Sequence, residues 1–458
     1  MPLKSLSDLG TDLAAGRLTA SGLAEQAITR ATEASGEGAR VFTRLYVDRA
    51  PKLAAASDAA RAAGLVRSPI EGLPISVKDL FDVAGEPTLA GSVALDDAAP
   101  AERDSPVVRR LLAAGAVLVG RTNMTEFAFS GLGLNPHYGT PLNPYDRATG
   151  RIPGGSSSGA AVSVADGMAA AAIGSDTGGS VRIPSALCGL TGFKPTAARV
   201  PREGVLPLST SLDSIGPLAP TVACCAALDA VLSGSDAPAP AAVSPAALRL
   251  AIPTTLVFDG IDDAVAAAFQ ATIALLRQTG AQVTEIAVPE FAGFASINAK
   301  VSFAAAEAWH WHRELIARAG GRYDPRVAVR IRRGADMLAA DYIELVTARA
   351  AWIAAVEQRL APFDALLMPT VPVIAPELAP LEADDALFGS TNLLMLRNPT
   401  LINFLDGCAL SVPCHRPGEA PVGLSVAGTR GQDSGILSIG LGIEALLAGA
   451  GRGALAAR

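Results

Sequence analysis

Two serine clusters bracketed by glycines mark the segment that spans residues 150–196. The first is GGSSSG at residues 154–159, and the second is TGGS at residues 177–180. The whole chain has four histidines, and none of them lies in this segment. A serine nucleophile needs a base to take its proton, and lysine is the available base where histidine is missing. The pattern therefore favours a serine nucleophile that is activated without histidine.

Lys78 is the lysine that stands out. It ends the apolar run LPISVK at residues 73–78, where a charged ammonium group is costly unless it is paired or deprotonated. To act as a base near neutral pH, a lysine needs its pKa lowered from about 10.4 to near 7, which burial can achieve. Two other interpretations remain open from the residues alone. Lys78 could reach solvent at a strand end, or it could pair with Ser76 on the same strand face, although that pair has no glycine turn to donate backbone N–H groups.

Other interpretations of the glycine and serine clusters fit less well. A flexible linker is polar on both sides, but residues 160–173 after the first cluster are apolar and indicate a core segment. The sequence has no phosphate-binding G-x-x-x-x-G-K-[ST] or G-x-G-x-x-G motif at this place. Residues 155–159 match G-x-S-x-G with Ser157 as nucleophile, but that motif needs a preceding strand, and residues 143–153 indicate a loop with two prolines. His310 and His312 are two residues apart on an expected helix, so they point to different sides, which disfavours a histidine-based triad or a metal site there.

The elements that must position these residues alternate between helical and strand patterns. Residues 13–31 and 48–63 have apolar residues at helical spacing. Strand, helix and strand patterns follow at 74–77, 106–114 and 116–120, and again at 248–252, 262–279 and 282–287. A helical stretch at 304–360 and strands near residues 366, 410 and 422 complete the chain. The sequence predicts an α/β fold with parallel elements, and the Pro- and Ala-rich residues 233–246 are either a long surface loop or a hinge.

Composition and charge limit the classes of function. The chain has 458 residues, 50% hydrophobic and 18% charged, with a formal net charge of −7. Lysine and arginine are scattered, which disfavours direct binding of nucleic acid. No apolar run follows the first lysine, so we expect a cytoplasmic protein, and the apolar residues 159–174 and 436–449 are short for a membrane span and indicate core elements. Five cysteines without a C-x-x-C pair indicate reduced structural thiols.

The longer motifs around these residues resemble the amidase signature family of serine amidohydrolases. The resemblance rests on PGGSSSGAA at 153–161 and GSDTGGSVRIPSALCGLTGFKPT at 174–196, with further similarity around Lys78, at 115–129 and at 211–219. It covers most of the chain. It implies a single amidase domain over residues 1–458, with a central mixed β-sheet covered by α-helices on both faces. Residues 1–65 would be an N-terminal helical segment, 66–230 the catalytic core, and 247–458 the remainder of the sheet and the substrate-pocket helices.

The resemblance also implies a set of site residues. Ser180 would be the nucleophile, Ser156 the bridging serine that follows a cis peptide bond, and Lys78 the base. Ser156 and Ser180 are 24 residues apart, as in the family, whereas many members have glycine at the place of Ser158. The backbone of Thr177, Gly178, Gly179 and Ser180 would form the oxyanion hole, and the supporting residues would be Gly155, Ser157, Asp176 and Arg182. Arg182 could bind a substrate carboxylate, but we expect it to anchor the glycine loop.

The implied reaction is hydrolysis of a carboxylic amide to an acid and ammonia or an amine through an acyl-serine intermediate. No cofactor or metal is implied. The expected partners are a small-molecule amide substrate and either a second copy of the chain or a small accessory subunit; no membrane and no direct nucleic acid is expected.

Two alternatives use the same site: the glutaminase-like subunit of a tRNA-dependent amidotransferase, or a carboxybiuret or other urea-like amide hydrolase with a small partner subunit. TAARV at residues 196–200 lacks the Thr-Tyr-Gly-Arg-Val run expected of the amidotransferase subunit. An inactive binding module is a third alternative, although Lys78, Ser156 and Ser180 are all retained. We expect residues 124–137, 309–313 and 387–403 to line the acyl pocket.

Overall fold

One mixed β-sheet runs through the whole molecule. The computed structural model describes residues 3–300 and 302–453. Within them the sheet has eleven strands. In order across the sheet they are β1 (Phe42–Leu45), β3 (Val117–Thr122), β2 (Pro74–Lys78), β4 (Ala171–Asp176), β6 (Ser214–Ala219), β5 (Thr191–Lys194), β10 (Cys408–Pro413), β11 (Gly423–Gly428), β9 (Ala365–Pro369), β7 (Arg249–Pro253) and β8 (Gln282–Ile286).

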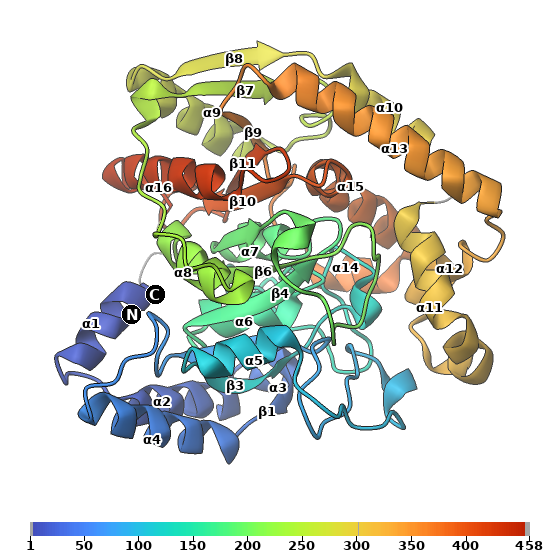
Figure 1. Ribbon diagram of the computed structural model, residues 1–458. Coiled ribbons are helices and arrows are strands. Elements are labelled where there is room, and N and C mark those ends of the chain that lie inside the picture. The colour runs from blue at the N-terminus through green and yellow to red at the C-terminus, as the bar shows by residue number, and fades with distance from the viewer. Residues whose placement is uncertain (1–2, 301, 454–458) are drawn as a thin grey trace.

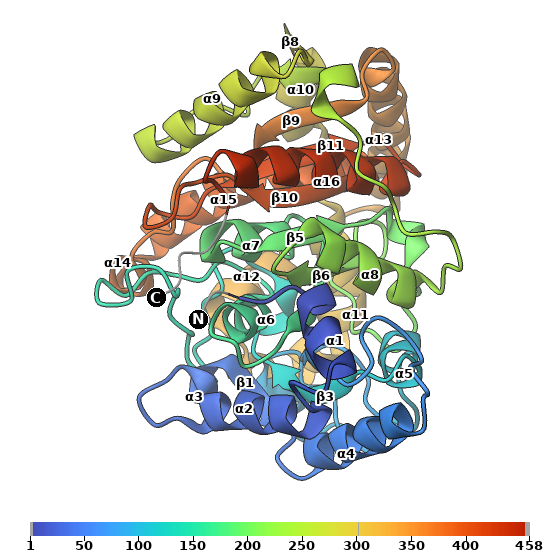
Figure 2. The ribbon, with the colours of Figure 1, turned by 90° about the vertical axis from the view of Figure 1, so that its left-hand side faces the viewer.

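Helices flank the sheet on either side, as Figures 1 and 2 show. They are α1 (Leu6–Ala14), α2 (Ala20–Thr32), α3 (Gly38–Val41), α4 (Arg49–Ala62), α5 (Pro106–Ala113), α6 (Ser158–Ala165), α7 (Arg182–Cys188), α8 (Val222–Ser233), α9 (Asp263–Gln278), α10 (Pro289–Ile297), α11 (Phe303–Ala319), α12 (Pro325–Arg332), α13 (Ala339–Leu360), α14 (Leu378–Ala383), α15 (Asp385–Phe404) and α16 (Asp433–Gly449).

The direction of the strands changes along the sheet. β2 is parallel to both of its neighbours, β3 and β4. β4, β6, β5, β10, β11 and β9 are then antiparallel in turn, and β7 is parallel to both β9 and β8. β5 therefore pairs with β10, so the sheet is continuous across the two parts of the chain that residues 233–246 connect.

The predicted α/β class with a central mixed sheet is confirmed. The expected strand, helix and strand units are present as β2, α5 and β3, and as β7, α9 and β8. The N-terminal segment is not only helical, because β1 forms the edge of the sheet within it. Its four residues are too few to show a periodic pattern, and only their pairing with β3 makes them a strand.

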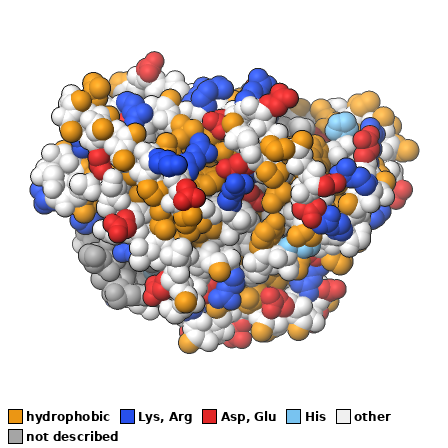
Figure 3. Space-filling view, turned by 90° about the horizontal axis from the view of Figure 1, so that it is seen from below, with side chains coloured by type: hydrophobic (Ala, Val, Ile, Leu, Met, Phe, Trp, Pro, Cys, Tyr) orange, Lys and Arg blue, Asp and Glu red, His pale blue; other side chains and the backbone are white. Residues whose placement is uncertain are grey.

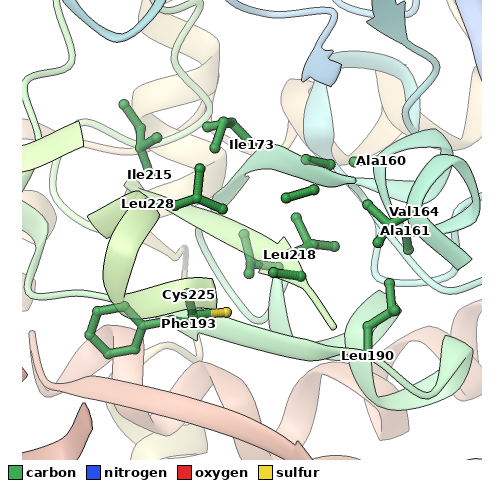
Figure 4. Packing of buried hydrophobic residues seen from close by; sticks show 14 of the residues in the cluster. Ala160, Ala161, Val164, Ile173, Leu190, Phe193, Ile215, Leu218, Cys225 and Leu228 are labelled. Carbon is green, nitrogen blue, oxygen red and sulfur yellow. The ribbon is translucent and has the colours of Figure 1, made fainter. Parts of the chain in front are cut away.

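The centre of the core lies between α6, α8 and the middle strands. Figure 4 shows Ala160, Ala161 and Val164 of α6 near residues of β4, β5 and β6, with Cys225 and Leu228 of α8 close to the same strands. All of these side chains are buried in one hydrophobic cluster. The glycine and serine clusters therefore adjoin well-packed core elements, as the apolar residues around them predicted.

The cysteines, the helices and the face seen from below give no evidence of a disulfide, a membrane span or a charged binding surface among the described residues. All five cysteines are buried and unpaired. No helix among the described residues combines the length and apolar character that a membrane crossing needs. On the face seen from below, positive and negative side chains are interspersed (Figure 3), so no field of one sign of charge covers that face.

Candidate active site

Lys78 is buried at the end of β2 and contacts two hydroxyl groups. Its Nζ lies 2.7 Å from Ser156 Oγ and 2.9 Å from Ser175 Oγ. Its exposed fraction is 0%, so the lysine does not reach solvent. Ser76, the alternative partner, instead has its Oγ 2.9 Å from Ser163 Oγ. The structure thus brings Lys78 to the first serine cluster.

Burial lowers the pKa of Lys78 to about 7, although Asp213 and Asp176 raise it in part. The physical cause is the loss of hydration of the ammonium group, which favours the neutral amine. Neither carboxylate forms an ion pair with Lys78, because Asp176 pairs with Arg182 and Asp213 accepts hydrogen bonds from Thr177 Oγ1 and from backbone N–H groups. The lowered pKa therefore favours the neutral amine that a base near neutral pH needs.

The first serine cluster is held by close backbone contacts just before α6. The peptide bond between Gly155 and Ser156 is cis. A Cβ on Gly155 would lie 2.6 Å from the backbone nitrogen of Gly133, so only glycine fits there. The N–H of Ser157 donates to the carbonyl oxygen of Ser180 at 3.2 Å. This bond links the two serine clusters, which are distant in the sequence.

The second cluster forms a tight loop between β4 and α7. Gly179 has φ +123°, and a Cβ there would lie 2.6 Å from Cβ of Pro399, so the position requires glycine. Asp176, the last residue of β4, accepts bonds from the N–H groups of Gly179 and Val181 at 2.9 and 3.1 Å. The N–H of Gly179 is therefore engaged, which leaves those of Thr177, Gly178 and Ser180 as the candidates for oxyanion donors.

Arg182 anchors this loop from inside the protein. Its Nη2 lies 2.9 Å from Asp176 Oδ1, with both side chains fully buried. The same nitrogen donates to the carbonyl oxygen of Pro399 and to Oδ1 of Asn403 in α15. Burial favours the neutral acid, but Arg182 holds the pKa of Asp176 well below its usual range. Arg182 is thus buried and paired with Asp176, although its Nη1 has no hydrogen-bond partner among the described residues. It does not line the cavity that Ser180 faces.

Three further residues contact the site residues, in roles that the sequence prediction did not give them, although Asn403 lies within the expected pocket segment 387–403. Ser175 gives Lys78 its second hydroxyl contact. Asp213 accepts a 2.5 Å bond from Thr177 Oγ1, and Asn403 donates to Asp176 Oδ1 at 2.9 Å. The sequence offers a signal for the contact of Ser175 with Lys78, because Ser175 lies near the end of a strand beside β2. Asp213 and Asn403 come from distant segments, and a single sequence gives no signal for such contacts.

Ser180 faces a cavity of about 300 Å³. A second cavity of about 480 Å³ adjoins it, because both are lined by Ala128, Thr177 and Leu208. Of the expected pocket segments, residues 124–137 contribute Ala128, Phe129 and Ser130, and residues 387–403 contribute several side chains of α15.

The expectation that residues 309–313 line this cavity is wrong. His312 is buried and lies 2.9 Å from the hydroxyl of Tyr323, and Trp309 packs against the main core. The start of α11, at Ala304 and Ala305, faces the cavity instead. Trp309 and His312 therefore belong to internal packing, whereas Trp311 is exposed. No cluster of three potential metal ligands occurs among residues 3–300 and 302–453.

Comparison with known proteins identifies the family. The family model for amidases matches residues 24–437. A 2-amino-5-chloromuconic acid deaminase of Comamonas testosteroni is 38% identical, with 87% of each chain covered. One subunit of the glutamyl-tRNA(Gln) amidotransferase of Chloroflexus aggregans is 35% identical, with 95% of each chain covered. The crystal structure of an amidase superimposes with a TM-score of 0.86 at 32% identity, covering 96% of this chain and 99% of the other.

The chain therefore belongs to the amidase family, as its motifs predicted. Enzymes of this family are hydrolases that act on amide C–N bonds, and the fold and general activity of this chain follow from that membership.

We expect Arg182→Ala to lower the free energy of unfolding by about 3–5 kcal/mol, because it leaves the carboxylate of Asp176 buried without its partner. Chemical denaturation followed by circular dichroism measures this loss. Arg249→Ala is a matched control that breaks the exposed pair with Asp364 and should change the unfolding midpoint far less. A stable Arg182→Ala variant that lost activity only toward carboxylated amides would contradict the anchoring role.

Proposed function

We propose that this chain is a serine amidohydrolase that converts a small carboxylic amide and water to an acid and ammonia or an amine. Ser180 is the nucleophile, Ser156 the bridging serine and Lys78 the base. The observation that carries the proposal is the 2.7 Å contact between Lys78 Nζ and Ser156 Oγ in a fully buried position. Membership of the amidase family supports the same reaction class.

We infer a proton relay through these three groups. The neutral amine of Lys78 takes a proton from Ser156 Oγ, and Ser156 takes one from Ser180, since a hydroxyl both donates and accepts. Ser180 Oγ then bonds to the amide carbon. When the C–N bond breaks, the same relay returns a proton to the leaving nitrogen. Water attacks the acyl-serine by the reverse path and releases the acid.

The glycine loop supplies the electrostatic part of the mechanism. The carbonyl oxygen becomes an oxyanion in the tetrahedral intermediate, and fixed N–H donors stabilise it. Thr177, Gly178 and Ser180 present backbone N–H groups at the loop that Asp176 and Arg182 hold in place. Because the loop is already anchored, little reorganisation is needed when charge develops on the oxygen.

An amidotransferase component remains the second candidate, because one of the relatives carries that name. Such a chain would pass ammonia to a partner protein, or would need that partner to complete its pocket. Assay of the purified chain alone, without ATP, metal or tRNA, separates the two functions. Ammonia release from simple amides by the isolated chain favours the free-standing amidase. Labelling of Ser180 without turnover until a small partner is added favours a multi-subunit enzyme, such as the urea-like amide hydrolase with a small partner subunit.

We expect Ser180→Ala to lower amide hydrolysis by roughly 10⁴-fold or more with the fold retained, because the variant lacks the atom that bonds to the acyl group. An uncharged fluorophosphonate should label Ser180 in the native chain, as peptide mass spectrometry would show, and should abolish activity. EDTA should leave the rate unchanged. An adduct on Ser156 or Ser157 with Ser180 unlabelled would overturn the assignment.

The pH dependence of kcat/KM should follow the ionisation of Lys78. Because the neutral amine is the active form and the pKa of Lys78 is about 7, kcat/KM should fall about tenfold per pH unit below that value and level off above it. Asp213→Asn removes a negative charge that raises this pKa, so its profile should move to lower pH. Lys78→Ala should lose several orders of magnitude in rate. Near-normal turnover of a folded Lys78→Ala variant would mean that another group is the base.

A further inference from the structure

The cavity beside Ser180 is lined both by the reactive groups and by cationic side chains. Thr177, Gly178 and Ser180 form the reactive side. Much of the remaining wall is apolar and consists of Leu208, Leu212, Phe294, Leu393, Leu396 and Phe404. A volume of about 300 Å³ is at the small end of ligand pockets. The cavity therefore fits a small molecule with a short carbon skeleton.

Three arginines line this cavity, and no aspartate or glutamate does. They are Arg330 of α12, Arg333 just after that helix, and Arg397 of α15. Arg326, one turn before Arg330, has an acidic partner, because it forms an ion pair with Asp385 at 2.6 Å. The three arginines of the cavity have no such ion pair in the described part of the chain. Charged groups that are partly removed from water, as Arg330 is, normally have a partner of opposite charge, whereas Arg333 is exposed.

Arg397 is occupied by the protein itself. Its guanidinium donates to the carbonyl oxygens of Asp259 and Val257 and to Oδ1 of Asn398. These bonds hold α15 against the loop after β7. We therefore assign Arg397 a structural role.

Arg330 and Arg333 retain free donors. Arg330 uses Nη1 to donate to the carbonyl oxygen of Phe129 at 2.7 Å, and its guanidinium carbon lies 5.1 Å from the ring centre of Phe388. Its Nε and Nη2 have no protein acceptor in the described structure. Arg333 is exposed at the same cavity, and its side chain makes no hydrogen bond to a described residue.

The two guanidinium groups lie close enough to affect each other. Burial lowers the pKa of Arg330 to about 10, Asp324 opposes this change, and Arg333 adds to it. Arg330 still stays protonated at neutral pH. Asp324 does not neutralise it by direct contact, because its carboxylate caps the start of α12 by accepting from the N–H of Arg326. An anion bound between the two arginines would relieve their repulsion.

We propose that the substrate of this site carries an ionised carboxylate in addition to its amide, and that Arg330 and Arg333 bind that carboxylate. This inference rests on the proposed function and specifies its substrate class: monoamides of short dicarboxylic acids. The guanidinium fork matches the two oxygens of a carboxylate, and the apolar wall accommodates the carbon chain between the two ends. Because Arg330, Arg333 and Ser180 line the same cavity, a substrate bound by the arginines has its amide in the cavity that Ser180 faces.

The test compares each acid monoamide with its neutral diamide, which has nearly the same shape. The pairs are malonamate with malonamide, succinamate with succinamide, glutaramate with glutaramide, and adipamate with adipamide. For at least one chain length, we expect kcat/KM to favour the acid by tenfold or more. Arg330→Gln and Arg333→Gln should each lower that ratio by about tenfold or more. Arg333→Gln tests the proposal with less effect on folding, because the side chain of Arg333 makes no hydrogen bond within the described structure.

Arg332→Gln is the matched control. Arg332 is exposed on the same helix and does not line the cavity, so its variant should keep the wild-type ratio. An equal loss in all three variants would point to a general effect of surface charge and would overturn the proposal. A wild-type preference for the neutral diamide at every chain length would overturn it as well.

A second readout does not depend on turnover. Glutarate and succinate should slow the labelling of Ser180 by an uncharged fluorophosphonate, and this protection should weaken in the Arg333→Gln variant. Labelling without protection by either dicarboxylate would refute the carboxylate site while leaving the serine mechanism intact. No labelling of Ser180 at all, together with no hydrolysis of any amide, would refute the proposed function itself.

Discussion

The buried ion pair between Asp176 and Arg182 is the interaction on which the site depends. Asp176 ends β4 and Arg182 begins α7, so the pair closes the glycine loop that contains Ser180. The carboxylate also accepts N–H groups of the loop, and the guanidinium extends the network to Pro399 and Asn403 of α15. Removing two charges from water is expensive, and the surrounding hydrogen bonds offset that cost. The result is a fixed loop whose other N–H groups remain available for a substrate.

The same low-polarity surroundings give Lys78 its chemistry. A lysine beside a carboxylate keeps its proton, but here the nearby carboxylates are already engaged by Arg182 and Thr177. Burial then dominates and brings the pKa of Lys78 to about 7. The anchoring of the loop and the basicity of the lysine are therefore linked, because Arg182 neutralises the charge that would otherwise stabilise an ammonium group on Lys78.

The cavity combines elements from distant parts of the chain. The reactive side comes from the loop after β4, whereas the arginine side comes from α12 and the residue after it. α15 contributes to both, since Thr400 donates to the carbonyl oxygen of Gly178 and Arg397 fixes the outer wall. Sequence changes in α11 and α12 can therefore alter what binds without disturbing the loop, whereas α15 also holds the loop. Such a division suits a family whose members act on different amides.

The sequence alone determined the α/β class, the amidase family and the segments that carry chemistry. It could do so because the glycine and serine clusters are local, and because a lysine after an apolar run is visible in the chain itself. Only the tertiary structure decided that Lys78 contacts Ser156 and Ser175 rather than Ser76, and that Arg182 faces inward. It also placed β1 in the sheet, turned the start of α11 to the cavity in place of residues 309–313, and brought Arg330 and Arg333 there. Contacts of this kind join residues tens to hundreds of positions apart, so they depend on how the strands and helices pack, which no local pattern in one sequence records.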